Sequence, residues 1–166
     1  MTAMLNYGAA SQTYFKDRTH DLATSQLSAE AKELGTVDAT AFAHQKIGEL
    51  EGIKLTGATL MLDSETTIRI YFQPESGKSI EDFTFTVNGQ KATPTLYKGE
   101  YYISMPNIGA HNLDETYVFT CDDFEVHYSG RSYVNQLLKA YQSGPEHDLA
   151  RALYRYSEAA EAYLAN

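Results

Sequence analysis

The sequence predicts an α+β protein: a mainly antiparallel, immunoglobulin-like β-sandwich of about seven strands, flanked by an N-terminal helix and a C-terminal helical hairpin. Between residues 52 and 128, short runs of alternating apolar and polar side chains are separated by turn-forming residues. Strands repeated about every 8–12 residues are typical of antiparallel sandwiches, whereas parallel sheets need long crossover helices. Outside this region the apolar residues recur at helical spacing. We therefore expect residues 1–166 to form a single domain.

The first 50 residues are expected to be helical in places. Residues 1–17 form an amphipathic helix with a polar loop after it. Ser28 to Leu34 predicts one or two helical turns, because Ser28 can cap the helix start and Gly35 can end it. Residues 38–47 are a further short helical candidate.

The sandwich occupies residues 52–128. Its strands are expected at 55–62, 66–72, 82–87, 90–97, 100–105, 116–121 and 124–128. Asn88-Gly89 is the preferred dipeptide for a two-residue hairpin turn, so the strand after it should pair back antiparallel. Lys98-Gly99 and Asp122-Asp123 are expected to form two further turns.

Residues 130–166 are expected to form a helical hairpin. Arg131 opens its first helix, and Gly144-Pro145 separates the two helices, because proline suits the first turn of a helix. The expected core combines the inward strand residues with one apolar helix face. It comprises Leu60, Leu62, Ile68, Ile70, Phe72, Phe83, Phe85, Val87, Ile103, Phe119, Val126, Leu137 and Leu138.

An internal repeat links the two ends of the chain. Residues 3–15 align with residues 152–164 at a spacing of 149 positions. The identical pairs are Ala3 with Ala152, Tyr7 with Tyr156, Ala10 with Ala159, and Tyr14 with Tyr163. They step by 4, 3 and 4 residues and so share one helical face, which we expect to be buried.

This repeat has two interpretations. Helix 1–17 is either the closing helix of a preceding unit, so that the natural protein repeats this module in tandem, or one of two amphipathic helices that share Ala and Tyr by chance.

Several stretches together carry a family resemblance. Residues 4–15, Met-Leu-Asn-Tyr-Gly-Ala-Ala-Ser-Gln-Thr-Tyr-Phe, resemble the "MLNYGAAAQxYF" helix of large secreted proteins of gut Clostridia and ruminococci. Residues 60–72, 117–128, 132–134 and 152–163 are similar to other parts of the same module. The resemblance implies a repeated or C-terminal module of extracellular, multi-domain surface proteins, some of them linked to plant-polysaccharide use. It implies no catalytic residues.

Composition and motifs argue against several functions. A formal net charge of −9 disfavours a nucleic-acid partner, and no apolar run is long enough for membrane insertion. Cys121 is the single cysteine, which leaves no internal disulfide or Cys-rich zinc site and predicts a buried thiol. Hydrolase, phosphate-loop and EF-hand motifs are absent, and the histidines are not at ligand spacing. We expect no catalytic residue, no resident metal and no cofactor.

Strand alternation predicts which residues face outward and could bind a ligand. The candidates are Arg69, Tyr71, Tyr97, Glu100, Tyr102 and His127. Tyrosine rings pack on the apolar faces of sugars, and the polar groups hydrogen-bond to hydroxyls. The alternative is that these tyrosines lie beneath the helices and belong to the core.

Two functional hypotheses remain open. The first is a non-catalytic carbohydrate-binding module of a secreted or cell-surface protein, with starch-like α-glucans and plant-wall glycans as possible partners. The second is a structural spacer that stacks in tandem against neighbouring domains of the same chain and has no ligand of its own. A glycoside hydrolase, whose paired carboxylates can lie far apart in a sequence, is a third and disfavoured reading.

Overall fold

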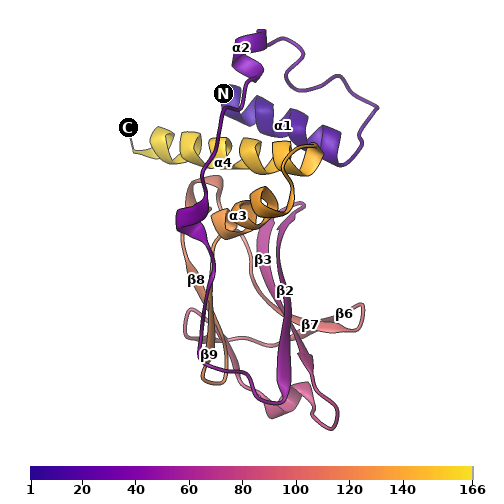
Figure 1. The fold of residues 1–166 in the computed structure, drawn as a ribbon, viewed down its shortest axis with the longest axis vertical. Helices are drawn as coiled ribbons and strands as arrows, with labels where there is room; N and C mark the ends of the chain where they lie inside the picture. The colour runs from indigo at the N-terminus through magenta and orange to yellow at the C-terminus, as the bar shows by residue number, and fades with distance from the viewer. Residues whose placement is uncertain (166) are drawn as a thin grey trace.

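The protein is α+β, with two antiparallel sheets packed face to face, in a computed structural model that describes residues 1–165 (Figure 1). The β8 sheet has the strand order β1 (Gln45–Ile47), β9 (Phe124–Tyr128), β8 (Tyr117–Cys121), β4 (Phe85–Val87), β5 (Gln90–Lys91). The β3 sheet has the order β2 (Ile53–Leu62), β3 (Thr66–Pro74), β7 (Glu100–Met105), β6 (Thr95–Tyr97). Neighbouring strands in each sheet run antiparallel.

Residues 1–165 contain nine strands, and two differences account for the departure from the expected number. The helical prediction for residues 38–47 is wrong beyond one turn: Thr40–Phe42 is a 3₁₀ turn, and β1 follows it. All of β1 is exposed, so it has no apolar alternation to reveal it. The expected strand 90–97 divides into β5 and β6, which lie in different sheets. Pro94 lies between them and has no N–H to continue a ladder.

The predicted hairpin turns are confirmed, and one strand is shorter than expected. Asn88 and Gly89 have φ of 49° and 75°, as a type I′ turn requires, and they join β4 to β5. Lys98 and Gly99, with φ of 51° and 87°, join β6 to β7 in the same way. Residues 80–82 form a 3₁₀ turn, so β4 begins only at Phe85.

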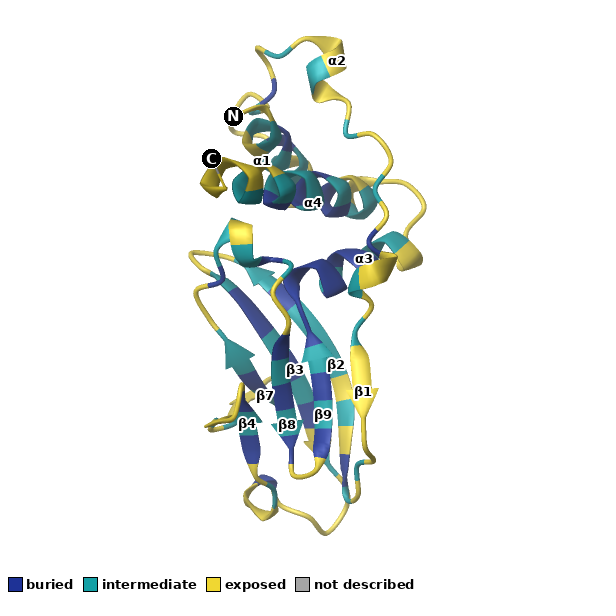
Figure 2. Ribbon diagram, turned by 90° about the vertical axis from the view of Figure 1, so that its left-hand side faces the viewer, coloured by how far each residue is buried: buried dark blue, intermediate teal, exposed yellow. Residues whose placement is uncertain are grey.

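The main core lies between the two sheets and is built from buried residues of both, and Figure 2 marks the buried strand positions in dark blue. The rings of Phe72 and Phe85, one from each sheet, approach to 5.3 Å between centroids. Nine of the expected core residues are buried. The other four, Leu62, Phe83, Leu137 and Leu138, are partly buried and pack against the core.

The helices lie across one end of the sandwich and leave the outer sheet faces open (Figures 1 and 2). They are α1 (Thr2–Tyr14), α2 (Ala29–Lys32), α3 (Gly130–Ala140) and α4 (Pro145–Leu164). Both chain ends lie at the same end of the α1–α4 pair, so these helices are antiparallel (Figure 1). None of the helices described combines the length and apolarity needed to cross a bilayer.

The helical face marked by the repeat is only partly buried. Tyr7 stacks on Tyr156, with ring centroids 5.4 Å apart and planes at 9°. Ala159 is exposed and Tyr163 is 82% exposed, and the other expected residues of the face except Ala152 are only partly buried, so the expectation of a buried face is wrong for both α1 and α4. Since the helices are antiparallel and meet at Tyr7 and Tyr156, the last turn of α4 extends past the first turn of α1.

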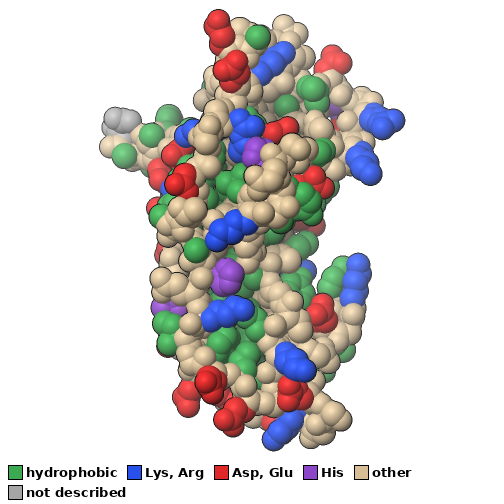
Figure 3. Space-filling model, viewed as in Figure 1, with side chains coloured by type: hydrophobic (Ala, Val, Ile, Leu, Met, Phe, Trp, Pro, Cys, Tyr) green, Lys and Arg blue, Asp and Glu red, His purple; other side chains and the backbone are tan. Residues whose placement is uncertain are grey.

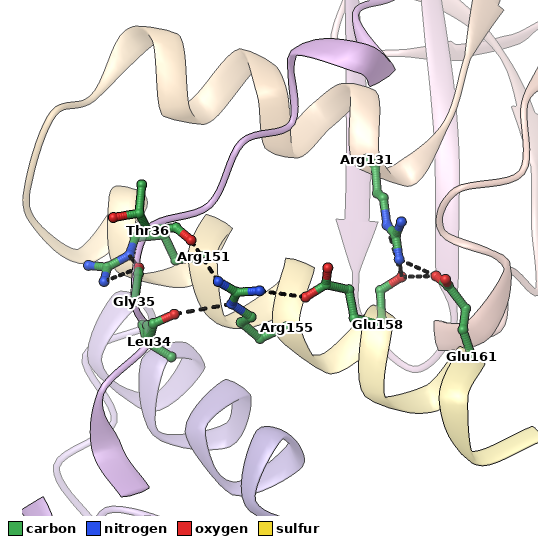
Figure 4. Close-up of polar contacts among 9 residues, drawn as sticks. Leu34, Gly35, Thr36, Arg131, Arg151, Arg155, Glu158 and Glu161 are labelled. Carbon is green, nitrogen blue, oxygen red and sulfur yellow. Dashed lines mark hydrogen bonds and ion pairs between the residues drawn. The ribbon is translucent and has the colours of Figure 1, made fainter. Parts of the chain in front are cut away.

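Three arginines hold the helical layer together (Figure 4). Arg151 donates to the carbonyl of Gly35 at 2.8 Å, and Arg155 donates to the carbonyls of Leu34 and Thr36. These bonds fix the irregular segment after α2 to α4. Arg131 of α3 donates to Ser157 Oγ at 2.9 Å and pairs with Glu161, both on α4.

Candidate ligand-binding face

The outer face of the β3 sheet gathers five of the six candidate residues. Arg69 and Tyr71 lie on β3, opposite the inward series of Ile68, Ile70 and Phe72. Tyr71 is paired in register with Tyr102 of β7, and Tyr97 of β6 with Glu100 of β7. Strand pairing thus brings side chains more than 30 residues apart in sequence onto one surface.

Aromatic rings surround the guanidinium of Arg69. Its Cζ lies 4.4 Å from the Tyr102 ring centroid and 5.9 Å from that of Tyr97. The rings of Tyr71 and Tyr102 are 5.6 Å apart and inclined at 52°. Cation–π and ring–ring contacts therefore hold three tyrosines in fixed orientations, two of them partly buried and Tyr97 47% exposed.

A groove of about 300 Å³ runs between these rings and β2. Tyr71, Tyr97, Lys98 and Glu100 line one side, and residues 56–59 of β2 line the other. At Gly57, beside a register shift in β2, an added Cβ would meet nothing within 4 Å, so the missing side chain leaves the groove open. Figure 3 shows the β6–β7 hairpin standing out from the body of the molecule, with a hollow beside it.

His127 does not belong to this face. It lies on β9, in the other sheet, where it is paired in register with Gln45 of β1. Its Nε2 lies 2.8 Å from Glu125 Oε2. Alternation correctly put His127 on an outer surface, but it cannot tell which sheet a strand joins. The proposed grouping of His127 with the other five residues is therefore wrong.

Sequence reasoning missed the β2 side of the groove and Lys98. Lys98 was assigned only a turn role, yet its Nζ lies 5.1 Å from the Tyr97 ring centroid. A glycine inside a strand pattern often marks a bulge or a close approach, and Gly57 was the available signal. Thr59, the register partner of Arg69, had no signal of its own.

The remaining side chains that could be reactive are held in their neutral, less reactive forms. Cys121 is buried on β8, and burial, with Asp122 nearby, raises the pKa of its thiol to about 12. Burial, together with Glu115, likewise raises the pKa of Tyr117 to about 12. Within residues 1–165 no three His, Cys, Asp or Glu side chains converge as a metal site would require.

Comparisons with protein-family models, with curated proteins and with solved structures gave no match. The groove and its tyrosines are therefore the observations from which a function can be argued.

Proposed function

We propose that this protein is a non-catalytic carbohydrate-binding module that holds a glycan on the outer face of its β3 sheet. The observation that carries the proposal is a cluster beside an open groove, in which Tyr97 and Tyr102 lie against Arg69 and Tyr71 packs on Tyr102. The helices do not cover this surface.

The geometry suits a sugar chain in two ways. A pyranose ring has apolar C–H faces that pack on aromatic rings, and the fixed tyrosines offer such surfaces at little entropic cost. Lys98, Glu100 and Thr59 line the same groove and supply donors and acceptors for hydroxyl groups. A glycan can therefore satisfy both the apolar and the polar parts of the groove.

Binding without hydrolysis fits the groove better than catalysis. Among the described residues that line it, Glu100 carries the one carboxylate. Glycoside hydrolases use a pair of carboxyl groups, about 5–10 Å apart, across the scissile bond. The resemblance to secreted surface proteins supports a location outside the cell, with starch-like or plant-wall glycans as partners.

We also propose that the sandwich is immunoglobulin-like. Its β2-β3-β7-β6 order corresponds to the ABED sheet of that fold, and the β9-β8-β4 part of the other sheet corresponds to GFC. β1 and β5 extend the second sheet on either side.

Affinity electrophoresis on starch, xylan, cellulose and polygalacturonate tests the binding role. We expect retardation on at least one polymer, weakened roughly 5- to 30-fold by Tyr97→Ala, since one stacked ring contributes about 1–2 kcal/mol. Tyr141→Ala is the matched control, because Tyr141 is 42% exposed on a different surface, just after α3. Unchanged mobility on every polymer would remove the proposal.

A structural spacer is the second candidate, and one observation favours it. Tyr7 stacks on Tyr156, its own counterpart in the 149-residue repeat, so helices of this sequence pair with each other through equivalent residues. Successive units could then stack helix on helix. If the units stack in this way, X-ray scattering from two copies joined in tandem should show a rigid, extended particle. Two units that move independently of each other would count against the spacer role.

A further inference from the structure

We infer that the groove selects glycans that carry a carboxylate, such as uronic or sialic acids, and that Arg69 is the residue that recognises this group. The inference rests on the proposed carbohydrate-binding function and adds the chemical class of the sugar.

Arg69 is held in place but has no acceptor. Its guanidinium packs on Tyr102 and approaches Tyr97, yet no hydrogen bond or ion pair from it is found within residues 1–165. The three other arginines that are at least partly buried there, Arg131, Arg151 and Arg155, all donate to oxygens. A buried N–H donor without a partner costs about 1–3 kcal/mol, so Arg69 is held at this position at an energetic cost.

A second unpartnered polar atom lies next to Arg69. Its Nε and the Oγ1 of Thr59 are both buried without a hydrogen bond, and the two residues are register partners on β3 and β2. Thr59 also lines the groove. Two buried, unsatisfied groups from neighbouring strands therefore lie beside the groove, and a ligand would contact Arg69 through the terminal N–H groups of its guanidinium.

The local charge favours an anion. The protein has a formal net charge of −9, yet this surface holds Arg69 and Lys98 against the single carboxylate of Glu100. Within residues 1–165 the ion pairs involve neither Arg69 nor Lys98. Both cations are instead placed against tyrosine rings, which leaves their charge uncancelled.

The geometry of the guanidinium points to a carboxylate. The guanidinium lies over the ring of Tyr102, a contact that uses none of the hydrogen bonds its terminal N–H groups can donate. The edge of a guanidinium presents parallel N–H donors that match the two oxygens of a carboxylate. The carboxyl group of an acidic sugar extends from the ring edge, so the sugar face can rest on a tyrosine while its acid reaches Arg69.

Calorimetric titration of the whole protein tests the inference. The probes are oligogalacturonate, glucuronic-acid-substituted xylan, sialyllactose, unsubstituted xylan, maltoheptaose and dextran sulfate. We expect one carboxylated sugar to bind at least tenfold more tightly than the neutral ones. Oligogalacturonate and the substituted xylan carry uronic acids, whereas sialyllactose carries sialic acid. Comparison of their affinities therefore shows which kind of acidic sugar the groove prefers.

Variants of Arg69 assign the preference to one residue. Arg69→Gln should weaken binding of the carboxylated sugar at least tenfold, and Arg69→Lys, which keeps the charge but loses the fork, should recover part of the loss. Arg18→Gln is the control, because Arg18 is exposed in the loop after α1. Thermal melting of each variant verifies that it is folded.

Each alternative result has a definite meaning. Equal affinity for acidic and neutral sugars, or an acidic preference that survives Arg69→Gln, overturns the inference and leaves the carbohydrate-binding role in place. Dextran sulfate bound as tightly as the carboxylated sugars would indicate a general anion surface and also overturns it. Absence of binding to all six probes overturns the inference together with the proposed function.

Discussion

Two arginines in this protein pack on aromatic rings but differ in whether the protein supplies them with a hydrogen-bond acceptor. Arg131 is 5% exposed, has its Cζ 5.0 and 4.7 Å from the ring centroids of Phe42 and Tyr154, and also donates to Ser157. Arg69 has a comparable aromatic setting with no acceptor. Removal of a paired buried cation leaves its partners unpaired, whereas an unpaired buried donor is itself kept at a cost. The contrast separates a structural arginine from a binding one.

This contrast predicts different stabilities for matched substitutions. Arg131→Met should lower the free energy of unfolding by roughly 2–4 kcal/mol, because it removes a partly buried ion pair and leaves Ser157 without the N–H groups that donate to it. Arg69→Met should change it by less than about 1 kcal/mol, because the lost cation–π contacts are offset by removal of an unpaired buried donor and no protein acceptor is lost. Urea denaturation of both variants measures the difference. Equal losses would contradict the assignment of Arg69 to ligand binding.

At the scale of elements, the inward face of the β8–β9 hairpin is deeply buried. Tyr117, Phe119 and Cys121 on β8 and Val126 and Tyr128 on β9 are each at most 3% exposed. Burial raises the pKa values of Cys121, Tyr117 and Tyr128, with Cys121 and Tyr117 both at about 12. These groups are neutral in the folded chain at pH values where the unfolded chain ionises them.

The hairpin therefore predicts a loss of stability in alkali. Between pH 9 and 12 the folded protein keeps protons that the unfolded chain releases, so the free energy of unfolding falls as pH rises. Below pH 8 the free energy of unfolding should not depend on these groups, because they are protonated in both the folded and the unfolded chain. Urea denaturation across this range measures the slope, and Cys121→Ala should reduce it. A free energy of unfolding that stays constant up to pH 11 would show that burial does not raise the pKa values of these groups.

The elements differ in how well the sequence predicts them. Strands with an alternating apolar face, such as β3 and β9, are found close to their expected bounds, because burial on one side fixes their register. Asn88-Gly89 and Lys98-Gly99 specify their turns by backbone chemistry alone. β1 is exposed throughout and paired only at its edge with β9, so its strand state depends on a tertiary contact that no local pattern encodes.

At the scale of the whole molecule, the position of the helices decides which surfaces are available. The Tyr7–Tyr156 stack and the Arg151 and Arg155 bonds bind α1, α4 and the segment after α2 into one layer at the end of the sandwich. The outer face of the β3 sheet therefore remains open (Figure 2). Alternation could place Tyr71, Tyr97 and Tyr102 on an outer face, but the assignment of His127 to the other sheet required the strand order.

NMR titration of the ¹⁵N-labelled protein with oligogalacturonate and xylo-oligosaccharides tests the central claim directly. We predict chemical-shift changes that cluster on the outer face of the β3 sheet, at residues 56–59 of β2 and at Arg69, Tyr71, Tyr97 and Tyr102. Amides near His127 and in the last turn of α4 should stay unchanged. Shifts confined to those two regions, or no shifts with either sugar, would contradict the assignment of this face as the binding site.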